Sequence, residues 1–290
     1  MPNLCEIHTK SNIEYGRITM NNPFSEAKNV FLEKVDTMDY IDLDINIVAR
    51  HRLEQLIDKV PFQIVILTGK PGVGKSYLIK QIEQSVPKDR LHIQLFPFLS
   101  LNGFLAQLHI KFLPHIKISK NMTRDEFFKS FSNNLKREDL SPTIIIDEVQ
   151  LYGDKELEVI RMLSDCRVFR FILVTHSLKN KEVLNESYFT SRTWDKVIIK
   201  ELDTKGINLF ITQKLNKANM STILRLFKDW HFRFIYRQTR GNLRLLARMC
   251  FLMFDLCEHY YIAEPTLFNK GEIPKKVLEM AAIELGSINV

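Results

Sequence analysis

The sequence predicts an α/β fold, with helices on both faces of a parallel sheet, followed by a smaller all-helical domain. Between residues 46 and 203, short apolar runs alternate with helical segments, as in a chain of βα units. A glycine-rich turn follows the first apolar run, and beyond residue 203 the apolar spacing is helical throughout. We therefore expect an N-terminal extension over residues 1–45, an α/β domain over 46–203 and a helical lid domain over 204–290.

The α/β part opens with helical apolar spacing from Ile47 to Ile57. Runs of β-branched and apolar residues then predict strands at 62–67, 91–95, 144–147, 169–175 and 197–202. Parallel strands need crossover connections, so this order favours a three-layer sandwich. In the last part, helices are predicted at 204–216, 221–237, 242–260 and 274–285, with Gly206, Gly241 and Pro274 near their boundaries.

Residues 69–76, GKPGVGKS, fit the phosphate-binding pattern G-x-x-x-x-G-K-[ST] at every fixed position. Glycines are needed because backbone N–H groups must approach an anionic phosphate where a Cβ would intervene. Lys75 then offers a charge to the β- and γ-phosphates, and the Ser76 hydroxyl a ligand to Mg²⁺. The helix that follows adds a favourable dipole. The residues expected to contact the nucleotide are Gly69, Lys70, Pro71, Gly72, Val73, Gly74, Lys75, Ser76 and Tyr77.

A later strand, within TIIIDE at residues 143–148, ends in two carboxylates. We expect Asp147 to hold Mg²⁺ through water, and Glu148 to orient and polarise the attacking water. The two acids taken alone could simply cap the next helix. Paired with the phosphate-binding loop, they favour hydrolysis of the nucleotide over its storage.

Composition agrees with a folded enzyme, since 290 residues with 45% hydrophobic side chains can bury a substantial core. The longest apolar stretch, residues 245–257, is too short to cross a bilayer, and the N-terminus lacks the features of a secretory signal. We therefore expect a cytoplasmic protein. The guanine-reading pattern N-K-x-D is met only imperfectly, by NKGE at 269–272 in the helical part, so ATP is favoured over GTP.

Together, these segments resemble the AAA+ ATPases. The resemblance is carried by the phosphate-binding loop, the acidic pair, a strand ending in Thr175 and His176, Arg192 before another strand, and TRGNLR at 239–244. Within this class, the chain is most similar to the ExeA-like branch, also called general secretion pathway protein A. The transposition helpers and the ORC/Cdc6 initiators are its neighbours. NPF at 22–24 and MAAIELG at 280–286 also resemble that branch, and the likeness covers residues 20–286.

The resemblance implies further roles for residues. Thr175, or the adjacent His176, would be the sensor of the γ-phosphate or attacking water, with Thr175 ranked first. Arg244 would reach the γ-phosphate from the lid of the same subunit, and Arg192 would complete the site of a neighbour in a ring or filament. The implied catalytic set is Glu148, Lys75, Arg192 and Thr175, acting on ATP with Mg²⁺.

One position departs from the ExeA-like pattern. Where that branch often has Asn-Pro after its second strand, this chain has Phe96-Pro97. The asparagine usually restrains the catalytic glutamate, and phenylalanine cannot make that hydrogen bond. Either another polar group restrains Glu148 or activity is gated differently.

The net charge of +7 is concentrated in the lid. The segment 214–248 contains nine lysines and arginines but a single acid, Asp229, and aromatic residues are interleaved with them. This segment could bind duplex DNA through its phosphates, or it could be a solvated face over buried aromatics. The acidic N-terminal extension could dock a partner or a neighbouring lid.

Two classes of function stay open. One is an ATPase that drives assembly or remodelling in a secretion, pilus or DNA-uptake machine, with components of that machine as partners. The other is a DNA-binding ATPase that regulates transposition or replication.

Overall fold

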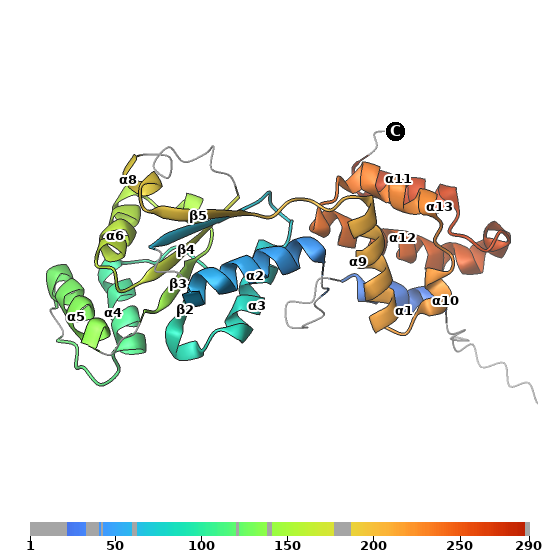
Figure 1. Ribbon diagram of the computed structural model, residues 1–290. Helices are drawn as coiled ribbons and strands as arrows, with labels where there is room; N and C mark the ends of the chain where they lie inside the picture. Colours follow the sequence, from blue (N-terminus) through green and yellow to red (C-terminus); the bar gives the residue numbers. More distant parts are fainter. Residues whose placement is uncertain are drawn as a thin grey trace, which may run out of the picture.

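The computed structural model describes residues 22–32, 41, 43–59, 63–119, 122–137, 141–176 and 187–287. The sheet with its covering helices forms one end of the molecule, and the C-terminal helices form the other (Figure 1). Phe62 of the first predicted strand lies outside the described residues, as does most of the acidic N-terminal extension. Among the described helices, none is both long and apolar enough to span a bilayer.

The sheet is parallel throughout, as predicted, and contains five strands in the order β2-β3-β4-β1-β5. Their bounds are β1 (Ile64–Thr68), β2 (Leu91–Gln94), β3 (Thr143–Ile146), β4 (Arg170–Thr175) and β5 (Thr193–Ile198). This order inserts β4, the fourth strand of the chain, between β1 and β3.

Helices cover both faces of the sheet. Successive side chains of a strand point to opposite faces. Ile64 and Ile66 of β1 join a core with α4 (Leu101–Phe112), α5 (Arg124–Arg137) and α6 (Asp154–Asp165). Val65 and Leu67 join a second core with α2 (Asp44–Lys59) and α3 (Lys75–Ser85). The predicted three-layer sandwich is therefore confirmed. Short helical turns complete it at η1 (Lys88–Arg90), η2 (Val149–Leu151) and α8 (Ser187–Thr190).

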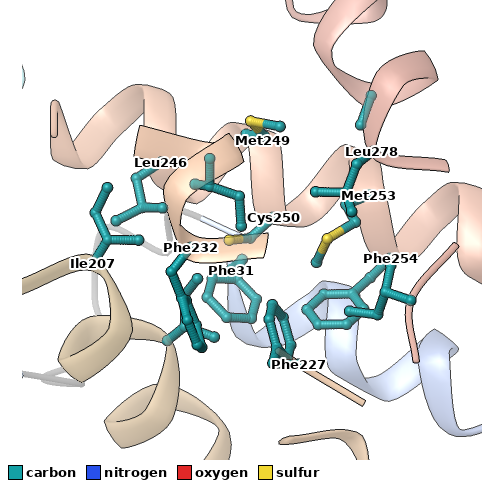
Figure 2. Packing of buried hydrophobic residues seen from close by; sticks show 14 of the residues in the cluster. Phe31, Ile207, Phe227, Phe232, Leu246, Met249, Cys250, Met253, Phe254 and Leu278 are labelled. Atoms are coloured by element: carbon teal, nitrogen blue, oxygen red, sulfur yellow. The ribbon is translucent and has the colours of Figure 1, made fainter. Parts of the chain in front are cut away.

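The C-terminal part is all-helical, as expected. Its elements are α9 (Thr204–Lys217), α10 (Ser221–Leu224), α11 (Asp229–Thr239), α12 (Leu243–Ala263), η3 (Pro265–Phe268) and α13 (Lys275–Glu284). They share a core with α1 (Pro23–Val30) and the residue after it, Phe31, whose ring centroid lies 5.6 Å from that of Phe254 (Figure 2). Residues near the start of the chain thus pack with its end. The domain division at residues 45 and 203 stays a prediction.

Two predicted elements differ from the observed ones. The helix predicted at 221–237 is two helices, because residues between α10 and α11 turn Phe227 into the core. His231 stabilises the break, since its Nδ1 accepts from the Lys228 N–H at 2.7 Å. The last strand begins at Thr193 instead of Val197. It is an edge strand with exposed Trp194 and Ile198, so its hydrophobic pattern is weak.

Candidate nucleotide site

The strand order brings three predicted segments to one edge of the sheet. Thr68 at the end of β1 pairs with Thr175 at the end of β4, and Ile146 of β3 pairs with Leu173 of β4. The phosphate-binding loop, His176 and the acidic pair therefore all begin at the carboxyl edge of the sheet. Ligands of open parallel sheets bind at that edge.

The phosphate-binding loop leads directly into α3, as its sequence predicts. Gly72 has φ +79°, and a Cβ built on it would lie 2.5 Å from Oδ1 of Asn242, so a larger residue would be strained and crowded. Val73 is buried in the core beneath the loop. Ser76 is exposed on the first turn of α3 and Tyr77 is half-buried there. Lys70 is exposed and forms an ion pair with Glu201.

Lys75 is buried, and its ammonium group is surrounded by acceptors. Its Nζ donates to the carbonyl oxygens of Gly69 at 2.7 Å and Lys70 at 3.1 Å. It also lies 2.8 Å from Nδ1 of His176. Burial lowers the pKa of Lys75, while the carboxylates of Glu148 and Asp147 act in the opposite direction.

The acidic pair lies at the end of β3. Asp147 is buried, which raises the pKa of its carboxyl group, and its Oδ1 accepts the Glu148 N–H at 2.8 Å. Glu148 has φ +52°, a left-handed conformation that is unusual for this residue type. Its carboxylate accepts a hydrogen bond from Nε2 of His176, with 2.8 Å between Nε2 and Oε1.

Gln150 extends this cluster into a continuous network. Its Nε2 donates to the Glu148 carboxylate, and its Oε1 accepts from the buried Thr175 hydroxyl at 3.2 Å. Thr175 thus reaches Glu148 through Gln150, whereas His176 binds Glu148 directly. Gln150 belongs to none of the motifs recognised in the sequence. Its place two residues after a predicted catalytic acid was the only available signal.

The lid contacts the phosphate-binding loop at the start of α12. Nδ2 of Asn242 donates to the Pro71 carbonyl at 2.6 Å, and the Arg244 N–H donates to the Gly72 carbonyl at 3.2 Å. Asn242 also caps α12, because its Oδ1 accepts from the Leu245 N–H at 3.2 Å. The Arg244 charge contributes to the lowered pKa of Lys75, which places it in the field of the loop. Asn242 lies in the TRGNLR segment that resembles the AAA+ ATPases, but the resemblance predicted no role for it.

Arg192 is the one predicted site residue that the fold keeps away from this cluster. It precedes Thr193, which pairs with Ile64 at the start of β1, whereas the phosphate-binding loop follows the end of β1. The intervening strand length is on the order of 17 Å. Its guanidinium donates to both carboxylate oxygens of Asp165, at 2.5 and 3.0 Å.

The donor set fits Mg²⁺. In the part of the chain that the structure describes, no cluster of three or more His, Cys, Asp or Glu could hold a metal ion. Mg²⁺ does not need such a cage, because it keeps several waters and binds through one or two protein groups plus substrate phosphates. The Ser76 hydroxyl and the Asp147 carboxylate supply such groups.

The fold and this site define a P-loop nucleoside triphosphatase architecture. Residues 62–182 match the sequence family described as AAA domain. With the parallel sheet and the helical C-terminal region, this match shows that the chain has the fold of the AAA+ P-loop ATPases. The ExeA-like branch within that class stays a prediction. The sequence matches none of the curated proteins with which it was compared.

Solved structures share the fold at low sequence identity. The ORC2 protein of Aeropyrum pernix, in ADPNP-ADP complexes, is 14% identical with a TM-score of 0.55, and the match covers 90% of this chain and 72% of that one. Cdc6p from Pyrobaculum aerophilum is 12% identical with a TM-score of 0.60, over 89% and 71%. Drosophila ORC bound to DNA is 11% identical with a TM-score of 0.65, over 93% and 67%.

The contact between lid and loop generates a prediction. Asn242→Asp keeps the oxygen that caps α12 but loses the N–H that binds Pro71, so the lid should separate more readily from the loop. We expect amide hydrogen exchange at Arg244 to quicken about fivefold, equivalent to about 1 kcal/mol for one hydrogen bond. Exchange at Leu245 should stay slow, because its cap is retained. Asn102→Asp on the exposed face of α4 controls for the added charge. Equal loss of protection at Arg244 and Leu245 would contradict this assignment.

Proposed function

We propose that this protein hydrolyses ATP with Mg²⁺ at the carboxyl edge of the sheet. The observation that carries the proposal is the single hydrogen-bonded network joining Lys75 to Glu148 through His176, directly beside the phosphate-binding loop. It places Lys75, a cation that can bind phosphate, and Glu148, a carboxylate that can activate water, at the same edge of the sheet. A cytoplasmic location is part of the proposal, because ATP is available there.

In this mechanism, the loop N–H groups and Lys75 bind the β- and γ-phosphates and favour the charge that develops on them. When bound, Mg²⁺ would add charge neutralisation, and the Ser76 hydroxyl and the Asp147 carboxylate would hold it. Glu148 orients and polarises the attacking water. Thr175 supports Glu148 through Gln150, and Arg244 acts from the lid on the same nucleotide.

The division of labour between Lys75 and Glu148 is testable with two variants. Lys75→Ala should weaken ATP binding by at least tenfold, because the loop loses its buried cation. Glu148→Gln should keep the affinity within about twofold and lower kcat by a hundredfold or more, as expected for loss of a general base. Calorimetric titration and phosphate release measure the two quantities. Lys88→Ala, at an exposed position in η1, is the matched control. Normal turnover by Glu148→Gln would show that another group activates water.

We also propose that the active form is an assembly in which Arg192 completes the site of a neighbour. Its position far from its own loop supports a role outside its own site. To act there, the guanidinium must leave Asp165, to which it is bound in this chain. The acidic N-terminal extension is a candidate contact between neighbours.

Assembly predicts that the ATPase rate per subunit rises with protein concentration. Arg192→Ala should remove that rise and lower the plateau rate by about a thousandfold, the scale of an arginine supplied to the γ-phosphate. Steady-state rates across a dilution series, alongside sedimentation with ATP, provide the measurement. Arg90→Ala, which removes an exposed arginine from η1, should behave as the unaltered chain. A rate per subunit that is flat on dilution and unaffected by Arg192→Ala would exclude this role.

Two processes remain candidates for the ATPase. The resemblance to the ExeA-like branch supports assembly or remodelling in a secretion, pilus or DNA-uptake machine. The lid surface supports the DNA-binding alternative, regulation of transposition or replication. Arg225, Arg233 and Arg237 are exposed, whereas Phe227, Phe232 and Phe234 are buried in the lid core. Such a surface would contact phosphates without stacking on bases. One structure that shares the fold is described as ORC bound to DNA.

DNA dependence separates the two processes. If the lid binds duplex DNA, the ATPase rate should rise severalfold with DNA at moderate salt and fall back as salt increases. Substituting Arg225, Arg233 and Arg237 with alanine should abolish the stimulation but not the rate without DNA. A triple variant of Lys88, Arg90 and Arg124, all exposed on the α/β part, controls for lost charge. No response to DNA in the unaltered protein would reject the DNA-binding candidate and leave the secretion or pilus machine.

A further inference from the structure

The proposed water-activating residue is held by partners that the sequence did not predict. Phe96, which stands where an asparagine was expected, has no polar side-chain atom, and the residue is 75% exposed. Its backbone carbonyl accepts instead from the Tyr152 hydroxyl at 3.0 Å. Glu148 receives its hydrogen bonds from His176 and Gln150. The hydrogen bonds that restrain Glu148 therefore come from His176 at the end of β4 and from Gln150 in η2, and not from the residue that follows β2.

The contacts of His176 define its tautomer. The Lys75 ammonium has only donors, so Nδ1 of His176, 2.8 Å from Nζ, must accept. Nε2 then carries the hydrogen and donates to the Glu148 carboxylate. One neutral imidazole thus links the phosphate-binding lysine to the water-activating glutamate. A second proton on the ring would point an N–H at the ammonium and break the link.

The same contacts occupy the ammonium group fully. Its hydrogens go to three acceptors, the carbonyls of Gly69 and Lys70 and Nδ1 of His176. A phosphate oxygen that binds Lys75 must therefore displace an acceptor. The carbonyls belong to the backbone of the loop, whereas the His176 side chain is 32% exposed and can rotate about its own bonds. His176 is the acceptor that can yield without moving the loop.

We propose that His176 is a positioning residue that couples Glu148 to the occupation of Lys75 by phosphate. While Nδ1 accepts from Lys75, the ring is fixed and its Nε2–H holds the Glu148 carboxylate. A triphosphate that recruits Lys75 releases Nδ1, and the imidazole and Glu148 can then turn together toward the attacking water. The backbone of Glu148 is constrained at φ +52°, so side-chain hydrogen bonds decide where its carboxylate points. This inference rests on the proposed ATPase function.

Kinetics of two His176 variants test the coupling. His176→Ala removes a competitor for Lys75 and also a donor to Glu148. We expect ADP affinity to rise about fivefold, and KM for ATP and kcat to fall together, because the variant loses a group that competes with the nucleotide for Lys75 and a donor that positions Glu148. His176→Gln carries one acceptor and one donor and should recover at least half of the lost kcat. His51→Ala on α2, where the side chain is exposed, is the matched control. Weaker ADP binding by His176→Ala, or no recovery with His176→Gln, overturns the proposal.

A second measurement needs no nucleotide. Long-range ¹H–¹⁵N spectra of the protein should show His176 as the neutral tautomer with hydrogen on Nε2. The Lys75→Met substitution should shift the Nδ1 resonance of His176, and the Glu148→Gln substitution should shift the Nε2 resonance of His176. A hydrogen on Nδ1, or no response to Lys75→Met, overturns the coupling whatever the activity. Conversely, a protein that passes both tests and binds ADP but never hydrolyses ATP would refute the proposed hydrolase function alone.

Discussion

The site depends on the parallel pairing of β4 with both β1 and β3. Because β4 lies between them, the residues that follow it lie between the phosphate-binding loop and the acidic pair. His176 can therefore contact Lys75 on one side and Glu148 on the other. An order in which β4 did not lie between β1 and β3 would separate these side chains by at least one further strand spacing, about 4.8 Å. The chemistry proposed for the site therefore depends on the order of the strands in the sheet.

Burial makes the hydrogen bonds of the site necessary as well as useful. It disfavours the charged form of both Lys75 and Asp147, lowering the pKa of the lysine and raising that of the acid. Nearby groups of opposite charge and polar partners offset that penalty for each residue. An arrangement that keeps a cation and two carboxylates together at the end of a hydrophobic sheet must satisfy their polar atoms locally. His176 bonds to Lys75 and Glu148, and Gln150 bonds to Glu148, so three hydrogen bonds from these two residues serve the charged groups.

The lid is joined to this edge through backbone contacts. Gly241, with φ +73°, lies so close to Leu202 that a Cβ on it would be 1.9 Å from the Leu202 carbonyl oxygen. Only glycine permits that approach. The following residue, Asn242, caps α12 and binds Pro71 at the same time. The lid core, which includes α1, therefore supports the N-terminal end of α12, where Asn242 contacts the phosphate-binding loop.

The sequence by itself determined the fold class, the loop, the acidic pair and their elements, because glycine spacing, apolar runs and helical periodicity are local signals. It misplaced β5, whose edge position leaves Trp194 and Ile198 exposed, and it merged α10 with α11, between which the chain turns and buries Phe227. His176 was offered by the sequence only as the alternative to Thr175, and only the tertiary structure decided that it contacts both Lys75 and Glu148 and that Gln150 and Asn242 belong to the site. Their partners lie on strands and loops distant in sequence. The order of strands in a sheet follows from the packing of the whole chain, so no local sequence pattern predicts it.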